Sequence, residues 1–485
     1  MAGYGYPVFI FAYPLPYIMA ELFHLSGFNL AVSLKLVFVL SYLASTMAMY
    51  FFASQYWQSR KAGFLSALLW SWAPYIFVKI FITASLGVVV SYAFIPLFFL
   101  SLYKLIKNPK FSYSIYLALT TSAWLLSHSF TPIIFSPLIG LFLLFNFRSK
   151  KRKQVIKYLS LSILFTFGLT AWYLVPALTE LKYTRFADFI THGYANYFVT
   201  LKRLLYSKWG TGAPGWSNNP LSQQVGIAQW LAVLLALFLT SSKHTRKQLT
   251  TKVWPFLISF FLSIYLMLKI SKPAWDTIPL LDTVHIPWRF LTLSVFSAAL
   301  CAGFLVKRLK KQWLQIIVFG LLISLAIYGN RNHLRINEVK KYSQSFFNSY
   351  TGVATGSNEH LPIWIKDIPH EFPNNKVETI SGDCRITNLV NKSNTTKFEA
   401  QCSKESKILI NTAYYPGWHV IINNSDNTHQ VISNLEHNNG VIEISLNPGD
   451  YHIEAIFRNE GYRQLSILVS IASLLLLLYL KLKIV

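Results

Sequence analysis

Long apolar stretches alternate with short polar loops along the chain as far as residue 329. A helix that crosses a membrane needs about 20 mostly apolar residues, or about 17 at the short end. Stretches near that length with few charges therefore predict membrane-spanning helices. We identify eleven of them, at residues 29–54, 62–80, 85–103, 112–127, 130–147, 156–178, 225–241, 253–270, 290–306, 313–329 and 463–480.

A polar region from about residue 330 to 460 separates the last two apolar stretches. Within it, short β-branched runs bounded by turn residues are typical of strands, and Asn438-Asn439-Gly440 and Asn447-Pro448-Gly449-Asp450 have turn chemistry. Together they predict a small β-sandwich. The predicted strands are Val377–Val390, Thr396–Ser403, Lys407–Thr412, Trp418–Ile422, Val441–Leu446 and Tyr451–Phe457.

Composition supports a membrane protein with one polar insert. The 485 residues are 53% hydrophobic and 13% charged, whereas soluble domains have about 25% charged residues. The formal net charge of +25 would suit a nucleic-acid partner, but the basic residues gather in short loops between apolar stretches. That distribution is typical of the cytoplasmic face of a membrane protein, and we expect no nucleic-acid binding.

The charged loops predict the topology. Alternate loops carry Lys and Arg but no Asp or Glu, which assigns them to the cytoplasm. These loops lie at 60–61, 104–110, 148–157, 243–252, 307–311 and 481–483. The predicted organisation is an outer loop or re-entrant segment at 1–28, a transmembrane helical domain at 29–329 with outer loops at about 179–224 and 271–289, an extracytoplasmic β-rich domain at 330–460, and a C-terminal transmembrane helix at 461–485. We therefore expect a multi-pass protein of the cell membrane.

The chain has three cysteines. Cys301 lies in an apolar stretch and is predicted to be a small core residue. Cys384 and Cys402 lie on consecutive predicted strands of the polar region. If that region is exported, the two are a candidate disulfide.

Several motifs occur in a fixed order along the chain. Tyr415-Pro416-Gly417-Trp418 is the most specific. The others are Gly3-Tyr4-Gly5-Tyr6-Pro7, Tyr13-Pro14-Leu15-Pro16-Tyr17, Ser127-His128-Ser129, Trp172 to Glu180 with Pro176, Leu204 to Gly210, Gln224-Val225-Gly226, Pro287-Trp288-Arg289-Phe290, and Glu359 to Trp364.

With these motifs the chain resembles bacterial membrane proteins of the GT-C glycosyltransferase type, in the subfamily called 6-pyruvoyl-tetrahydropterin synthase-related, and it is similar to YfhO-type proteins. The label does not imply pterin chemistry. GT-C enzymes carry a catalytic Asp or Glu in the first outer loop, after the first helix. The resemblance implies that this helix and loop would precede the first residue of this sequence.

The resemblance implies transfer of a hexosyl group from a polyprenyl-phosphate donor to a glycan or lipid acceptor of the cell envelope, on the outer face. Such chemistry needs a carboxylate that activates the acceptor hydroxyl, cations that hold the phosphate, and a groove that admits the isoprenoid chain from the membrane lipids. The resemblance leaves open whether a divalent metal ion serves as a cofactor. The chain has no Walker loop and no dinucleotide fingerprint, which fits a lipid-linked donor.

Five carboxylates lie outside the β-rich region: Glu21, Glu180, Asp188, Asp276 and Asp282. Glu180 is the first candidate for the catalytic base because an ionisable group at an outer helix end is costly unless it has a function. The alternative is a structural partner for an arginine or a helix end. Asp282 and Glu21 are further catalytic candidates, while Asp188 and Asp276 are predicted to be solvated loop residues.

For the phosphate, Arg289 is the first candidate, since it enters a predicted span beside Trp288 and can offer two donors. The alternative is an arginine that extends toward the membrane interface. Arg185, Lys202 and Arg203 are second candidates.

His128 is a further candidate for substrate binding, or alternatively a hydrogen-bonded structural residue. Trp209, Trp216 and Trp418 are candidates for stacking on sugar rings, although tryptophan is also common at membrane interfaces. No His, Asp and Glu residues have tight metal-ligand spacing.

Two other functions remain open from the sequence. One is a catalytically inactive or truncated scaffold that binds glycan through the β-rich domain. The other is a transporter or flippase, for which internal repeats and charges in mid-span would be expected. The sequence has no clear repeat and few such charges, which favours the glycosyltransferase over a transporter or flippase.

Overall fold

The computed structural model forms two compact units. The β-sandwich unit comprises Met1–Ala12, Ala171–Thr191 and Val339–Ile471, and the helical unit comprises Tyr13–Thr170, His192–Glu338 and Ala472–Val485. The structure describes residues 3–147, 151–186, 193–214, 217–241, 247–333, 339, 341–343, 345–346, 349–350, 358–424, 429–432 and 436–484.

A helix, or a bent helix pair, lies at each of the eleven apolar stretches. These are α3 (Leu30–Trp57), α4 (Arg60–Ser71) with α5 (Pro74–Phe77) and the π-helix η1 (Val78–Ile82), α6 (Leu86–Lys107), α7 (Phe111–Ser127), α8 (Thr131–Asn146), α9 (Arg152–Thr179), α12 (Ile227–Thr240), α13 (Lys247–Met267), α16 (Leu291–Arg308), α17 (Gln312–Gly329) and α19 (Gly461–Ile484). Shorter helices precede α3 or lie between the long helices: α1 (Val8–Phe11), α2 (Pro14–Leu25), η2 (Leu181–Tyr183), η3 (Gly193–Tyr197), α11 (Leu201–Leu205), η4 (Lys269–Ser271), α14 (Lys272–Thr277), α15 (Pro279–Val284) and η5 (Pro287–Phe290).

The number of spans that helix length supports is smaller than the eleven predicted. Within the described residues, seven helices are long and apolar enough to cross a membrane, or eight if the bent pair is one span. The helices α7, α8 and α12 have only 17, 16 and 14 residues. At 1.5 Å per residue, 14 residues cover about 21 Å of a hydrocarbon core about 30 Å thick. The predicted helix positions are confirmed, but length alone does not make the shortest helices complete spans.

Local sequence signals explain where the long helices begin and bend. The side chain of Asn29 accepts a hydrogen bond from the backbone of Val32 at 2.9 Å, and Ser59 caps α4 in the same way. Pro74 cannot donate a backbone hydrogen bond, so it starts a new helix after α4. The resulting bend between α4 and the segment Pro74–Ile82 is 47°.

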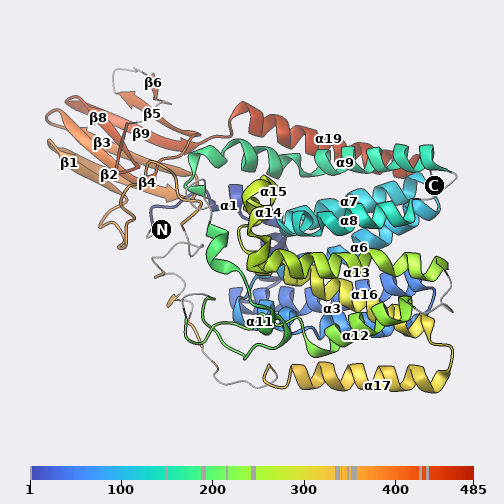
Figure 1. Cartoon of the computed structure of the whole chain (residues 1–485). Helices are drawn as coiled ribbons and strands as arrows, with labels where there is room; N and C mark the ends of the chain where they lie inside the picture. The colour runs from blue at the N-terminus through green and yellow to red at the C-terminus, as the bar shows by residue number, and fades with distance from the viewer. Residues whose placement is uncertain are drawn as a thin grey trace. The chain divides into compact units, whose positions relative to one another are not determined.

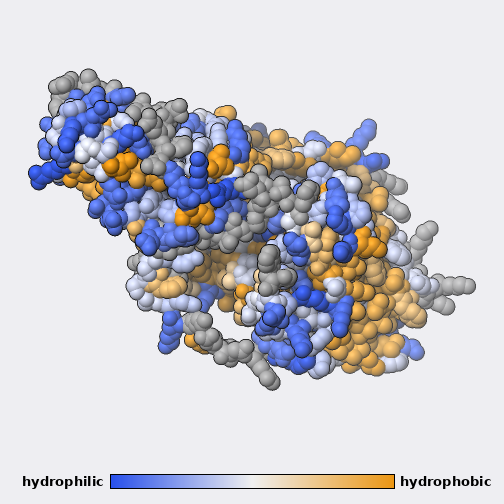
Figure 2. All heavy atoms as spheres, turned by 60° about the vertical axis from the view of Figure 1, so that its left-hand side comes forward, coloured by the Kyte–Doolittle hydropathy of each residue, from blue (hydrophilic) through white to orange (hydrophobic). Residues whose placement is uncertain are grey.

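The core of the helical unit is built around α16 and α6. In their most apolar windows, 94% and 83% of the residues are buried, against 11% in α17. Phe52 of α3, Phe99 of α6 and Phe296 of α16 pack against one another, with 5.3–6.2 Å between ring centres. The three helices are labelled in Figure 1. An apolar helix that stays exposed, such as α17, suits contact with lipid. Figure 2 shows hydrophobic side chains spread over much of the visible side of the helices.

The β-sandwich unit contains two antiparallel sheets that share one core. The strand orders are β1-β4-β8-β7 and β2-β3-β9-β5-β6. Ile408, Ile442, Val420 and Ile453 contribute to the shared core from both sheets. The strands are β1 (Val377–Ser381), β2 (Cys384–Lys392), β3 (Thr395–Cys402), β4 (Ser406–Ala413), β5 (Trp418–Asn424), β6 (His429–Ile432), β7 (Glu436–Asn438), β8 (Val441–Leu446) and β9 (Gly449–Phe457).

The β-sandwich predicted from the sequence is observed, but one predicted strand forms two separate strands. The run predicted as a single strand from Val377 to Val390 is wrong, because it forms β1 and β2 in different sheets. Gly382 separates them with a φ of +84°, and a side chain there would collide with the backbone of Glu405 and Ser406. The strands β6 and β7 were not predicted, since their short polar sequences carry little strand signal.

The three cysteines have different environments. Cys384 and Cys402 are direct cross-strand neighbours on β2 and β3, and a disulfide joins them. Cys301 is a buried free thiol in α16.

Candidate functional site

The helical unit contains a cavity of about 290 Å³ in which three basic side chains converge. We call it the cationic pocket and define it by Lys79, His128 and Arg289. The remaining lining residues are Tyr13, Tyr17, Tyr75, Ala84, Ser85, Leu86, Gly87, Val88, Thr131, Ile134 and Thr292.

Lys79 reaches the cationic pocket from the π-helix η1. A π-helical turn widens the helix by one residue and is frequent at functional sites. The side chain is 7% exposed, and its Nζ lies 4.8 Å from the ring centre of Trp288 and 5.2 Å from that of Tyr75. Among the described residues, no acidic side chain forms an ion pair with Lys79. Two aromatic faces therefore stabilise this ammonium group, and a bound anion would stabilise it further.

Arg289 comes from the short helix η5. Its Nη1 donates a hydrogen bond to the carbonyl oxygen of Val284 at 2.8 Å, and its guanidinium carbon lies 5.7 Å from the ring centre of Phe130. Trp288, the preceding residue, is buried under Lys79. The predicted pair of Trp288 and Arg289 thus belongs to one site, where Arg289 lines the cavity and Trp288 supports Lys79.

His128 lies between α7 and α8 and is 8% exposed. Its ring packs against Tyr13 with 4.6 Å between ring centres, and its buried Nδ1 has no hydrogen-bond partner among the described residues. Burial, together with the charges of Arg289 and Lys79, lowers the pKa of His128 well below its usual value. The imidazole is therefore neutral near pH 7 and can donate or accept one hydrogen bond toward a ligand.

Two backbone positions around the cationic pocket, Ala84 and Gly87, have unusual conformational or steric requirements. Ala84, which links η1 to α6, has a φ of +41°, a conformation that costs a non-glycine residue energy. At Gly87, a side chain would come within 2.6 Å of the carbonyl oxygen of Ser127 and 2.9 Å of the Tyr13 ring. Glycine is thus required for the close approach of α6 to this wall.

The arrangement is suited to an anion. No Asp or Glu lines the cationic pocket among the described residues. An arginine with two donor nitrogens, a lysine and several hydroxyl groups match the oxygens of a phosphate group.

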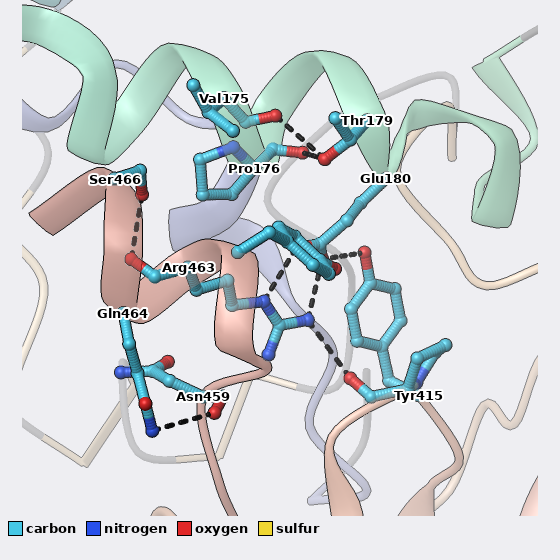
Figure 3. A network of polar contacts seen from close by, with 11 residues as sticks. Val175, Pro176, Thr179, Glu180, Tyr415, Asn459, Arg463, Gln464 and Ser466 are labelled. Atoms are coloured by element: carbon cyan, nitrogen blue, oxygen red, sulfur yellow. Dashed lines mark hydrogen bonds and ion pairs between the residues drawn. The ribbon is translucent and has the colours of Figure 1, made fainter.

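Glu180, the first candidate base, lies elsewhere, in the β-sandwich unit, and it is completely buried. Its carboxylate accepts two hydrogen bonds from Arg463, from Nε at 2.6 Å and Nη2 at 2.7 Å, and one from the hydroxyl of Tyr415 at 2.7 Å (Figure 3). The hydroxyl of Tyr462 donates a fourth hydrogen bond at 2.8 Å. We call this group the Glu180 clamp. Four donors occupy both oxygens, so the geometry favours the structural alternative for Glu180.

The Tyr415-Pro416-Gly417-Trp418 motif supplies one side of the Glu180 clamp. Burial and the hydrogen bond to Glu180 raise the pKa of Tyr415 well above its usual value, so its hydroxyl remains a donor. The carbonyl oxygen of Pro416 accepts a hydrogen bond from Arg463 at 3.0 Å. Trp418 begins β5 and is buried. The most specific motif of the sequence is therefore a structural joint between the sandwich and α19.

The other two candidate bases differ in exposure. Asp282 lies in the first turn of α15, and its buried Oδ1 has no hydrogen-bond partner among the described residues. Glu21 is exposed on α2. Asp276 forms an exposed ion pair with Lys272 at 2.7 Å and accepts a hydrogen bond from Tyr194. Of the three predicted bases, only Asp282 combines partial burial with an unoccupied carboxylate oxygen.

The remaining predicted residues do not line the cationic pocket. In the β-sandwich unit, Arg185 donates to the carbonyl oxygens of Ile365 and Lys366 and so fixes two chain segments together. In the helical unit, Trp209 packs on His333 with 3.6 Å between ring centres. Asp188 and Trp216 lie outside the described residues. The described part of the chain holds no group of three or more His, Cys, Asp or Glu side chains suited to a metal ion.

Sequence reasoning missed two residues that organise these sites. Lys79 lies within the apolar stretch 62–80, where a lone charge was itself a signal of function. Arg463, at the start of the last apolar stretch, is the partner that the structural alternative for Glu180 required. No sequence signal links it to Glu180, because the two residues are 283 positions apart.

The fold and the cationic pocket define a class of protein. A bundle of helices with several candidate membrane spans, combined with a C-terminal β-sandwich, is the architecture of a polytopic membrane protein. The chain belongs to the family described as 6-pyruvoyl-tetrahydropterin synthase related domain, membrane protein, whose model matches residues 10–332. Searches among curated proteins and among solved structures returned no match.

Proposed function

We propose that the protein is a membrane glycosyltransferase-like protein that binds the phosphate of a polyprenyl-phosphate-linked sugar in the cationic pocket. The supporting observation is the convergence of Lys79, His128 and Arg289 in a cavity of the helical unit, without an acidic side chain in its described lining. An anionic group at the end of an apolar chain suits such a cavity within an apolar helix bundle.

The proposed reaction transfers the sugar to a cell-envelope glycan or lipid. The acceptor hydroxyl attacks the anomeric carbon, the bond between that carbon and the phosphate oxygen breaks, and the phosphate leaves with the electron pair. Lys79 and Arg289 would stabilise the negative charge on the departing phosphate. Asp282, which is not part of the cationic-pocket lining, is the proposed base for the hydroxyl proton, because its buried Oδ1 has no hydrogen-bond partner among the described residues.

The phosphate-binding step is tested with the full chain in lipid nanodiscs and a radiolabelled polyprenyl phosphate. Lys79→Met and Arg289→Gln are each expected to weaken binding about tenfold or more, because each removes a charge-assisted contact. Arg289→Lys should fall between, since lysine keeps the charge and loses the paired donors. Lys35→Gln, at an exposed position of α3, is the matched control and should bind normally.

Two further measurements separate binding from chemistry. Polyprenol without phosphate should bind weakly to the unchanged protein. Asp282→Asn should retain phosphate binding and lose sugar release from a polyprenyl-phosphate sugar. Equal binding of polyprenol and polyprenyl phosphate, or normal binding by both pocket variants, would show that the cationic pocket is not the donor site.

The proposed function also needs the β-sandwich unit on the outer face of the cell membrane. After mild reduction, a membrane-impermeant thiol reagent is expected to label Cys384 and Cys402 in intact cells. In the matched control Lys310→Cys, within a predicted cytoplasmic loop, position 310 should react only after lysis. Labelling in the opposite order would refute this topology and the assignment of the positively charged loops.

A further inference from the structure

The β-sandwich unit has a larger cavity of its own, with a volume of about 660 Å³. We call it the sandwich pocket. One wall is the segment from Gly3 to Ile10, and the others come from the β2–β3 hairpin and the ends of β4, β5 and β9. Its size lies within the range of about 300–1,000 Å³ that is typical of small-molecule sites.

The N-terminal wall is fixed to the rest of the unit. The backbone nitrogen of Ala413 donates to the carbonyl oxygen of Tyr4 at 3.0 Å. The hydroxyl of Tyr173 donates to the carbonyl oxygen of Phe11 at 3.0 Å, and the Phe11 side chain is part of the sandwich core. The sandwich pocket is therefore a formed feature of the β-sandwich unit.

Aromatic side chains make much of its lining apolar. Tyr415, Trp418 and Phe457 contribute from the sandwich, and Tyr4, Tyr6 and Phe9 lie along the N-terminal wall. Aromatic rings pack well against the apolar C–H faces of sugars and of other flat or cyclic groups.

The polar part of the lining points to a particular kind of ligand. Thr412 is 6% exposed, and its buried hydroxyl has no hydrogen-bond partner among the described residues. Leaving a buried hydroxyl without a hydrogen bond is costly, and a polar ligand atom would supply that hydrogen bond. Asn391 and Asn394 add amide groups at the hairpin. A purely apolar acyl chain would leave the Thr412 hydroxyl unpaired.

The charges of the lining are positive. Lys376 and Lys392 line the sandwich pocket, and none of its described lining residues is acidic. Nζ of Lys376 donates to the carbonyl oxygen of Asn411 at 2.6 Å, and burial lowers the pKa of this lysine to about 8. A ligand anion beside Lys376 would offset the desolvation of its ammonium group.

We infer that the sandwich pocket binds a short acidic saccharide, whose sugar faces pack on the aromatic walls and whose carboxylate or phosphate pairs with Lys376. A free phosphate ion would leave most of the cavity empty, and a neutral sugar would not use the lysines. This inference goes beyond the proposed function, because it assigns a second ligand site and does not depend on donor binding at the cationic pocket.

The first test uses the unchanged full chain in nanodiscs of neutral lipid, with short oligogalacturonates as the probe. An amine-acylating reagent is applied at pH 8, and modification of each lysine is measured by mass spectrometry. Oligogalacturonate is expected to lower the acylation of Lys376 severalfold and to leave the exposed Lys404 unchanged. Neutral maltooligosaccharides of equal length should protect neither lysine.

Variants then test the contacts. Lys376→Gln is expected to weaken oligogalacturonate binding about tenfold, and Thr412→Val about threefold to tenfold. Lys376→Arg should retain most of the affinity, and Lys404→Gln all of it. A variant that fails to fold does not affect the result on the unchanged chain.

Three results would overturn the inference: unchanged acylation of Lys376 with oligogalacturonate, equal protection by neutral sugars, or protection only by anionic lipid vesicles. Failure of the proposed function is distinguishable, because Lys79→Met and Arg289→Gln act on polyprenyl-phosphate binding and should leave the Lys376 protection unchanged.

Discussion

Replacing Arg463 by methionine is expected to destabilise the β-sandwich unit by about 3–5 kcal/mol. The change leaves the Glu180 carboxylate completely buried with two tyrosine hydroxyls but no positive charge. A buried charge that loses its only ionic partner is far more costly than a buried pair that was never formed. We expect a lower midpoint of thermal unfolding and faster proteolysis of this unit in detergent.

Two controls test whether the loss of stability in Arg463→Met comes from the unpaired Glu180 carboxylate. Arg458→Met changes the same residue type at an exposed position and should shift stability by less than about 0.5 kcal/mol. The double variant Glu180→Leu with Arg463→Met removes both charges and should recover much of the loss. If the single variant were as stable as the unchanged protein, the Glu180 clamp would not be a structural element.

The same variants bear on the catalytic hypothesis for Glu180. If Glu180 is a structural residue, Glu180→Gln should lower stability and leave the sugar transfer per folded molecule unchanged. As a catalytic base, the same change should abolish transfer with little loss of stability. Four occupied hydrogen bonds around the carboxylate lead us to expect the first outcome.

The second large effect is expected at Gly417, where alanine should cost about 3 kcal/mol. Gly417 has a φ of +113°, which side chains rarely tolerate. A Cβ atom there would lie 2.8 Å from the carbonyl oxygen of Arg458 and 2.9 Å from Nη1 of Arg463. Alanine would thus strain the backbone and push against the Glu180 clamp, which thermal unfolding and proteolysis would detect.

The variant Gly5→Ala separates the cost of backbone strain from the cost of contact with the Glu180 clamp. Gly5 belongs to the same unit and has a φ of +72°, but no atom lies within 4 Å of the position of its Cβ. Alanine at Gly5 should therefore cost only the backbone strain, about 1–2 kcal/mol. Equal losses in the two variants would mean that contact with the clamp is unimportant.

Much of the fold was predictable because it depends on local pattern. Apolar runs located every long helix, and β-branched runs located most strands. The limits were also physical. The run from Val377 to Val390 carries continuous strand signal, and only the positive φ of Gly382 divides it between sheets. Helix length, rather than hydropathy, reduces the number of complete spans.

The candidate sites were predictable only in part, because they depend on contacts between distant segments. Arg289, Trp288 and His128 were identified one by one, and the fold brings them to Lys79, which was missed. The structural alternative for Glu180 anticipated an arginine partner. Its two tyrosine partners are 235 and 282 positions away and its arginine partner is 283 positions away, so no local sequence pattern could identify them.

This separation in sequence also sets an order of assembly. During synthesis Glu180 is made 283 residues before Arg463. Until those residues are made, the carboxylate has no guanidinium partner, so burying it in its charged form would be costly. The β-sandwich unit therefore reaches its final ionic state only after Arg463 has been synthesised.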